Sequence, residues 1–297
     1  MVISGFTYVR NGFLFGYPFL ASIQSLLPLV DELIVVVGDS TDGTREAIEQ
    51  LNNNKIIIVD TIWDEALRQN GQVFAQQSNI GLEATKGDWA IHLQVDEVFH
   101  EQDHSAILHW IHKADKNPQV EALLFPFYHF WGDFFHIRNT RKTHPFEIRA
   151  FKNTGHIRSY KDSQGFRKYT QANHPHKQHA GEKLRVWNTE IPVYHYSYAR
   201  HPDLMKKKDD YFQRFWHDDQ WVEKHVQGQS FNFNEVDQLE AFTGSHPQYM
   251  NPIIEAQNWV FNYDPSQSNM LIKDKFLNYL NRLTGKRWFE YKNYKLI

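Results

Sequence analysis

Short apolar runs alternate with helical patterns through the first half of the chain. The runs are β-branched or aromatic and lie between turn residues, which is typical of strands. They cover residues 2–9, 32–37, 55–60, 89–94 and 121–127. Three helices are expected between these strands. The first begins at Pro18, the second runs from a cap at Thr41 or Asp42 to Leu51, and the third spans residues 69–86 and ends before Gly87. This order predicts an α/β fold with a largely parallel central sheet flanked by helices on both faces.

The pattern changes after residue 127. Residues 127–200 are aromatic, rich in histidine and irregular, with strand-like pieces at 146–152 and 191–197. Helical spacing returns over residues 202–221 and 270–283, and the glycine at position 285 is a helix stop. We therefore predict a main domain over residues 1–199, divided near residue 125, and a C-terminal, mostly helical extension over residues 200–297 packed on it.

Composition excludes several classes of protein. The 297 residues carry 32 Lys and Arg against 35 Asp and Glu, so no broad positive field exists to hold nucleic acid. The absence of cysteine excludes a disulfide scaffold, a thiolate zinc site and a cysteine nucleophile. No stretch resembles a signal peptide or a membrane-spanning helix, and we expect a cytoplasmic protein without a membrane span.

Two motifs follow predicted strands at the sheet edge where ligands bind in such folds. In the first, residues 38–44 read Gly-Asp-Ser-Thr-Asp-Gly-Thr, which suits either a seat for ribose and phosphates or a capped turn. In the second, the strand at 89–94 leads to Asp96 and Glu97. Asp96 is a suitable oxygen ligand for Mg²⁺ or Mn²⁺, but the pair could equally cap a helix that begins near residue 101.

Taken together, these segments resemble a known family. Residues 31–37, the turn at 39–44 and the stretch 79–97 resemble, in order and spacing, the inverting family 2 glycosyltransferases of the GT-A fold. The resemblance implies a nucleotide-sugar half over residues 1–125 and an acceptor half over residues 126–199. It also implies a nucleotide-diphospho-sugar donor with UDP, GDP or dTDP, a divalent metal, Mn²⁺ or Mg²⁺, and single displacement onto a hydroxyl of a glycan or small acceptor.

The resemblance assigns roles by position. Asp96 stands at the metal-binding end of the family's Asp-x-Asp motif, whose first aspartate is replaced here by Gln94. Val37 replaces the aspartate that contacts the nucleoside in many members, so Asp39 is expected near the base. The residues expected to contact the donor are Phe6, Tyr8, Arg10, Asn11, Asp39, Arg68, Gln94, Val95 and Asp96.

Three further assignments concern the second half of the chain. His195 is expected to complete the metal shell, although a histidine in an aromatic strand can also be a core residue. Asp162, in a polar turn, is the expected general base for the acceptor hydroxyl, with Glu147 in reserve and turn capping as the alternative. The expected acceptor contacts are Trp131, Gln164 and Trp187, because aromatic faces stack on sugar rings.

Other functions remain compatible with the sequence. Gln94 and Val37 depart from the family pattern and would suit a glycan-binding or nucleotide-sugar-binding protein on a degenerate transferase scaffold. A nucleotide-sugar hydrolase or a phosphotransferase would keep the donor site and lose the acceptor base.

Overall fold

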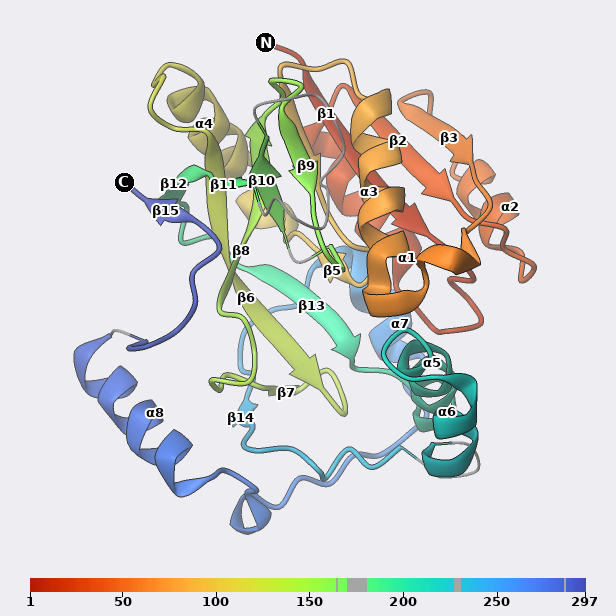
Figure 1. Ribbon diagram of the computed structural model, residues 1–297, viewed down its shortest axis with the longest axis vertical. Helices are drawn as coiled ribbons and strands as arrows, with labels where there is room; N and C mark the ends of the chain where they lie inside the picture. Colours follow the sequence, from red (N-terminus) through yellow and green to blue (C-terminus); the bar gives the residue numbers. More distant parts are fainter. Residues whose placement is uncertain (164, 170–180, 227–230, 286) are drawn as a thin grey trace.

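A twelve-stranded mixed sheet organises the chain (Figure 1). The computed structural model describes residues 1–163, 165–169, 181–226, 231–285 and 287–297. Four parallel strands in the spatial order β3-β2-β1-β4 form one side of the sheet. They are β1 (Ile3–Val9), β2 (Glu32–Val37), β3 (Ile56–Asp60) and β4 (Trp89–His92). The parallel order predicted from the sequence is confirmed for these strands.

The other side of the sheet is built around β6 (Ala122–Trp131). The antiparallel strand β8 (Phe146–Lys152) joins it to β4. The first half of β6 pairs with β12 (Arg185–Asn188) and the second half with β13 (Val193–Tyr198), both in parallel. Shorter strands complete the sheets: β5 (Glu97–Val98), β7 (His136–Ile137), β14 (Glu240–Ala241) and β15 (Lys295–Leu296) in the main sheet, and β9 (Ile157–Ser159), β10 (Phe166–Lys168) and β11 (Glu182–Lys183) in a separate one.

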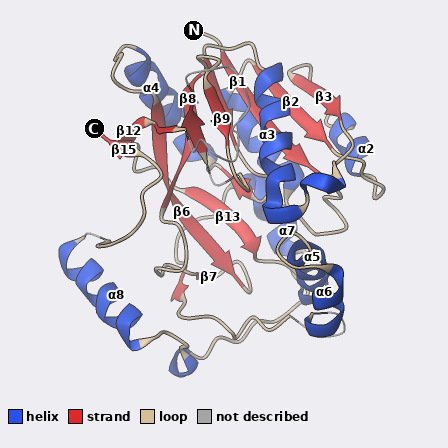
Figure 2. Ribbon diagram, in the orientation of Figure 1, coloured by secondary structure: helices blue, strands red, loops and turns tan. Residues whose placement is uncertain are grey.

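Helices cover both faces of the main sheet (Figure 2). The helices α1 (Phe19–Leu26) and α4 (His104–Asp115) pack on one face through residues such as Ile23 and Ile107. On the other face, α3 (Gln72–Ala84) and the small sheet pack through Leu82 and Phe166. Each face of the sheet has its own hydrophobic core. Alternate residues of β1 pack into these two cores, because successive side chains of a strand point to opposite faces.

Five further helices and six 3₁₀ turns are present in the described part of the chain. They are α2 (Thr44–Glu49), α5 (Pro202–Gln213), α6 (Asp219–His225), α7 (Asn251–Glu255) and α8 (Ile272–Thr284), with 3₁₀ turns η1 (Leu27–Leu29), η2 (Glu65–Leu67), η3 (Gln69–Gly71), η4 (Glu101–Asp103), η5 (Gln248–Met250) and η6 (Pro265–Gln267). The chain beyond residue 200 contacts the main sheet again, where β14 pairs with β7 and β15 with β12. In the described part of the chain, no helix is both long enough and apolar enough to cross a membrane.

Candidate active site

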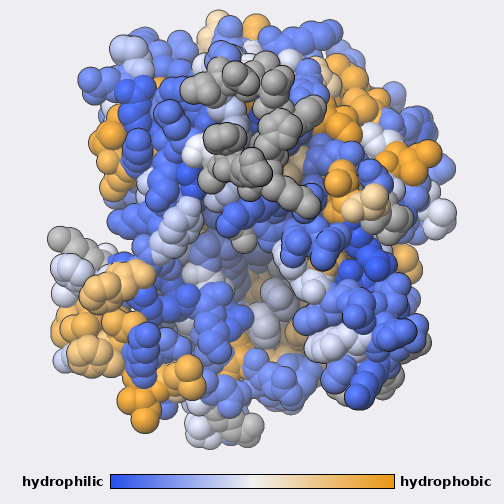
Figure 3. Space-filling model, in the orientation of Figure 1, coloured by the Kyte–Doolittle hydropathy of each residue, from blue (hydrophilic) through white to orange (hydrophobic). Residues whose placement is uncertain are grey.

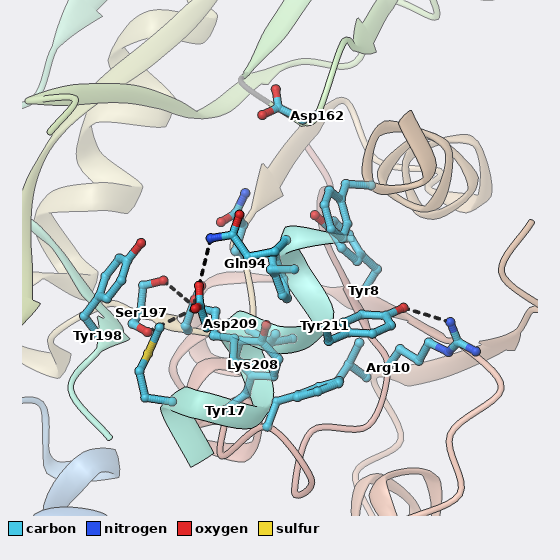
Figure 4. Close-up of a pocket in the computed structure, with 18 of the residues that line it drawn as sticks. Tyr8, Arg10, Tyr17, Gln94, Asp162, Ser197, Tyr198, Lys208, Asp209 and Tyr211 are labelled. Carbon is cyan, nitrogen blue, oxygen red and sulfur yellow. Dashed lines mark hydrogen bonds and ion pairs between the residues drawn. The ribbon is translucent and has the colours of Figure 1, made fainter. Parts of the chain in front are cut away.

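A pocket of about 370 Å³ opens beyond the carboxyl ends of β1 and β4, beside β13 and α5. Its polar lining comes from segments far apart in the sequence, and Figure 4 shows most of them turned toward a common space. The polar and aromatic residues that line it include Tyr8, Arg10, Tyr17, Gln94, Asp96, Asp162, His195, Ser197, Lys208, Asp209 and Tyr211.

Asp96 is the centre of charge in this pocket. Its Oδ1 lies 3.6 Å from Nε2 of His195, and its Oδ2 lies 3.7 Å from Nζ of Lys208 and 4.0 Å from a guanidinium nitrogen of Arg200. Burial alone would raise the pKa of Asp96, but His195, Lys208 and Arg200 outweigh it and hold that pKa well below its usual range. Asp96 is therefore a buried carboxylate among cationic groups.

Glu97 and Arg149 fix the turn that carries Asp96. Both oxygens of the buried Glu97 carboxylate accept hydrogen bonds from Arg149, at 2.6 and 2.7 Å, and one of them also accepts from the backbone N–H of Gln94. The capping alternative for this pair is wrong: the residue that caps η4 is His100, whose Nδ1 accepts from the N–H of Gln102.

Two histidines, His129 and His144, lie behind His195, the candidate metal ligand. Nδ1 of His195 lies 2.8 Å from Nδ1 of His129, and Nε2 of His129 lies 2.7 Å from the carbonyl oxygen of His144. Burial and the neighbouring His195 lower the pKa of His129 to about 3, so the ring is neutral at physiological pH. Its Nε2–H therefore donates to the carbonyl, and its Nδ1 accepts from His195.

The opposite wall of the pocket carries Asp162 (Figure 4). Asp162 lies in the turn between β9 and β10, where the flanking Lys161 and Ser163 have positive φ angles of 55° and 65°. The side-chain amide of Asn79 on α3 anchors this turn, because it accepts from the N–H of Ser159 and donates to the carbonyl of the same residue.

Gly71, just before α3, leaves room for Asp162. A Cβ at Gly71 would lie 2.9 Å from the Cβ of Asp162, and Gly71 has a φ of 62°. Two independent requirements, the backbone angle and the contact, therefore favour glycine at this position.

Comparison with known proteins identifies the family. The model of Glycosyl transferase family 2 matches residues 17–199, which is more than half of the chain. The chain belongs to this family. No curated protein matched the chain.

Several solved structures resemble the chain at low sequence identity. They include Staphylococcus aureus TarS 1-349, with 11% identity, a TM-score of 0.39, and coverage of 72% of this chain and 65% of that one. Its complex with UDP-GlcNAc has 12% identity, a TM-score of 0.40, and coverage of 72% and 71%. Glucosyl-3-phosphoglycerate synthase from Mycobacterium tuberculosis, in complex with Mn²⁺, UDP and phosphoglyceric acid, has 20% identity, a TM-score of 0.30, and coverage of 44% of each chain.

The residues present offer two protein ligands for the divalent cation expected in family 2. Asp96 Oδ1 and His195 Nε2, 3.6 Å apart, are close to the separation of about 3.0 Å that adjacent ligands of an octahedral Mg²⁺ take. Among the described residues, no group of three or more His, Asp and Glu side chains forms a closed metal site. This donor set fits an ion that completes its shell with diphosphate oxygens and water.

The donor-side residues expected from the family divide into two groups. Tyr8, Gln94 and Val95 line the pocket, as does Arg10. Arg10 donates one hydrogen bond to the Tyr211 hydroxyl (Figure 4). It donates another to the Asp39 carboxylate. Asp39 stands behind Arg10, outside the pocket lining.

The other three donor-side residues lie away from the pocket. Phe6 is fully buried in the core, where its ring stacks on His92 at 4.6 Å. Arg68 pairs with Asp219 of α6 at 3.2 Å. Asn11 holds the motif at residues 38–44, because its side chain accepts from the N–H of Thr41.

The motif at residues 38–44 mainly braces the neighbouring loop. Thr44 Oγ1 accepts from the N–H of Gly12, and Asp42 accepts from the N–H of Leu14. The helix α2 begins at Thr44 after Gly43, which is its N-cap residue. Asp42, one of the two expected caps, accepts from the backbone N–H of Thr44 at 3.2 Å.

Two of the expected acceptor residues, Trp131 and Trp187, are not in the pocket lining. Trp131 is buried, stacks on Tyr198 at 4.2 Å and donates to the carbonyl of Phe233. Trp187 packs edge-on against Trp110 of α4, on the apolar side of the sheet. Both rings pack against cores, and Trp131 also borders a separate hollow of about 380 Å³ that shares Tyr198 with the pocket. Gln164 lies outside the described residues.

Lys208 and Arg200 are the site residues that sequence reasoning missed. Lys208 belongs to a run of three lysines, but only it is buried there, and it donates to the Ser197 hydroxyl at 2.7 Å. Burial and the nearby Arg200 lower the pKa of Lys208 to about 7. Helical spacing from Met205 to Lys208 and Phe212 was the available signal, since it places the lysine on the apolar face of α5.

Proposed function

We propose that this chain is an inverting glycosyltransferase that moves a sugar from a nucleotide-diphospho-sugar to a hydroxyl of a glycan or small acceptor. The observation that supports it best is the division of the pocket: Asp162 forms one wall, and Asp96 with Lys208 forms the other. A sugar between these walls would have a proton acceptor on one side and a seat for its leaving group on the other.

Asp162 is the general base in this proposal. It takes the proton of the acceptor hydroxyl while that oxygen bonds to the anomeric carbon. The bond from this carbon to the diphosphate oxygen breaks at the same time, and its electron pair leaves with the nucleoside diphosphate. Attack from the face opposite the leaving group inverts the configuration. A positioned base of this kind contributes about 10²- to 10⁴-fold in rate.

Lys208 and Arg200 stabilise the charge that develops on the departing diphosphate. Both cations are buried near Asp96, where electrostatic interactions are stronger than in water. Asp96 and His195 would hold Mn²⁺ or Mg²⁺, which when bound would neutralise further negative charge on the same diphosphate. Of the two cations, Lys208 lines the pocket, whereas Arg200 lies outside the lining and acts through its proximity to Asp96.

The nucleoside is expected beside the aromatic part of the lining. Tyr8, Trp63, Phe74 and Tyr211 contribute ring faces or edges there, and the guanidinium of Arg10 lies 5.2 Å from the Trp63 ring centroid. A base stacks on such rings without strong selection for its identity. This arrangement supports donor binding at the β1 end of the pocket.

Glu147 is less suited to the role of base. It lines a separate cavity of about 220 Å³ with Tyr160 and Asn293. Burial, together with the charges of Glu97 and Asp162, raises the pKa of Glu147 to about 8. Its carboxyl is therefore mostly protonated at neutral pH and cannot accept a proton from an acceptor hydroxyl.

Asp162→Asn tests the assignment. We expect sugar transfer from a UDP-, GDP- or dTDP-sugar panel to fall by at least about 100-fold, with donor affinity retained, because the amide cannot accept the proton. The matched control is Asp209→Asn, which removes an equal charge from the same pocket. Equal transfer in Asp162→Asn and wild type would exclude this base.

The alternative functions predict other results for wild type. Hydrolysis of the donor without sugar transfer would favour a nucleotide-sugar hydrolase. Binding of an oligosaccharide without binding of a nucleotide would favour a glycan-binding protein.

A further inference from the structure

The helix α8 turns its apolar face to solvent. Ile272, Phe276, Tyr279 and Leu283 recur at helical spacing and share one side, and their exposed fractions are 87%, 61%, 59% and 65%. Asn278, by contrast, is buried. This distribution is the reverse of that expected for a helix that packs on a soluble domain, and Figure 3 shows the apolar surface at the lower left of the molecule.

Two aromatic residues extend this face beyond the helix. Trp288 is 48% exposed and Phe289 is 92% exposed. Their backbone is held against the main domain: a guanidinium N–H of Arg141 donates to the carbonyl of Trp288 at 2.7 Å, and Arg287 donates to the carbonyl of Thr140. The apolar face of α8, Trp288 and Phe289, which we call the α8 face, therefore projects from a segment anchored to the body of the protein.

Positive charge surrounds the α8 face. A hollow of about 480 Å³ beside it is lined by Arg141, Lys142 and Lys273 together with Phe276 and Phe289. From residue 271 to residue 289 the sequence has five Lys or Arg residues and one Asp, whereas the whole chain has a net charge of −3. Positive charge is thus concentrated where the apolar side chains are exposed.

We propose that the α8 face binds the surface of an anionic membrane. An amphipathic helix with exposed aliphatic and aromatic residues, flanked by Lys and Arg, inserts its apolar side at the boundary between headgroups and acyl chains. Trp and Tyr favour this same layer, and each nearby cation is attracted by anionic headgroups. Lys142, Lys273 and Lys275 are exposed and available for these contacts.

A second copy of the chain fits the α8 face less well. A symmetric dimer through this face would bring Lys142, Lys273 and Lys275 of one copy near the same residues of the other. Like charges brought together in this way oppose association, whereas an anionic bilayer is complementary to them. The proposal concerns a surface separate from the active-site pocket and does not depend on the proposed reaction.

Vesicle sedimentation of the full chain tests the proposal. We expect wild type to bind vesicles of phosphatidylcholine and phosphatidylglycerol in a two-to-one ratio, and much less to pure phosphatidylcholine. Ile272→Asp with Phe276→Asp should weaken binding at least about tenfold. Lys273→Ala with Lys275→Ala should weaken it by about fivefold per lysine. These residues are exposed, so circular dichroism should show unchanged folding.

The control variant replaces two exposed apolar residues elsewhere on the surface by aspartate. Ile62 and Val260 are both 82% exposed and lie outside α8, so Ile62→Asp with Val260→Asp should bind vesicles as wild type does. No binding of wild type to the anionic vesicles at low salt would overturn the proposal. An equal loss of vesicle binding in the control variant would also overturn it. So would the finding that wild type forms a dimer, which Phe276→Asp dissociates, and binds no vesicles.

Discussion

The Nδ1 atoms of His129 and His195 lie 2.8 Å apart, and this contact determines which nitrogen of His195 faces Asp96. Because Nε2–H of His129 donates to the His144 carbonyl, its Nδ1 accepts a hydrogen bond from Nδ1–H of His195. With a metal ion bound, His195 would be neutral, with its proton on Nδ1 and the lone pair of Nε2 available as a ligand beside Asp96 Oδ1. This is the tautomer that a metal ligand at Nε2 requires.

His129→Phe should weaken binding of Mn²⁺. The substitution removes the acceptor that orients His195 and keeps an aromatic ring in the space. We expect the affinity for Mn²⁺ in the presence of a nucleoside diphosphate to fall by about 10- to 100-fold, measured by isothermal titration calorimetry. His112→Phe, on the exposed side of α4, is the control and should have no effect. Unchanged affinity in folded His129→Phe would contradict this positioning role.

Two glycine substitutions separate backbone strain from displacement of the proposed base. Gly71→Ala and Gly43→Ala both place a side chain at positive φ, 62° and 83°, and each should lower the free energy of unfolding by roughly 1–2 kcal/mol. The Cβ at position 71 meets Asp162, whereas nothing lies within 4 Å of a Cβ at position 43. Transfer activity should therefore fall at least several-fold in Gly71→Ala alone. Equal activity in the two variants would show that this contact does not position Asp162.

The buried pair of Glu97 and Arg149 should matter strongly for stability. Arg149→Met leaves the Glu97 carboxylate buried without its ion partner and should lower the free energy of unfolding by about 3–5 kcal/mol in urea denaturation. Adding Glu97→Gln should recover part of this loss, because the double variant has no unpaired charge. Additive losses in the double-mutant cycle would mean that the two side chains do not interact.

Strand and helix positions were predictable where the signal is local. The run of β-branched residues at 32–37 coincides with β2, Pro18 directly precedes α1, and Gly285 ends α8 with a φ of 66°. These features depend on neighbouring residues alone. By contrast, β6 extends to Trp131 rather than ending near residue 127, because its second half pairs with β13 from a later part of the chain.

The charged centre of the site was predictable only in part. Asp96 and His195 stood out because each follows or occupies an apolar strand. The burial of Lys208 and Arg200 beside Asp96 depends on how α5 and the end of β13 meet β4, which no local pattern reports. Trp131 and Trp187 lie outside the pocket for the related reason that sequence does not tell which face of a strand borders a groove and which borders a core.

Stability should decline in mild acid. Burial lowers the pKa of both His92 and His129 to about 3, with added repulsion from Arg149 and His195 respectively. Unfolded histidine titrates near 6.5, so below that pH the unfolded state binds protons that the native state does not. The contribution of each buried neutral histidine to the free energy of unfolding is complete above about pH 6.5. It is lost as the pH falls toward 3, at up to about 1.4 kcal/mol per pH unit for each residue.

Substitution of one histidine should change this slope. His92→Asn should reduce the slope of the free energy of unfolding against pH between pH 6.5 and 4.5 by up to about 1.4 kcal/mol per pH unit, the contribution of one histidine. Urea denaturation at several pH values measures this slope. The exposed His112→Asn is the matched control and should leave the slope unchanged. The same slope in His92→Asn and wild type would show that His92 titrates normally in the native state.

The most direct test of the account is calorimetric titration of UDP, GDP and dTDP into wild type and Asp96→Asn, with and without Mn²⁺. The account predicts that at least one of these nucleotides binds wild type, that Mn²⁺ tightens the binding, and that Asp96→Asn abolishes the effect of Mn²⁺ while the protein stays folded. No binding of any of the three to wild type, or an equal effect of Mn²⁺ in Asp96→Asn, would contradict a nucleotide-sugar site centred on Asp96.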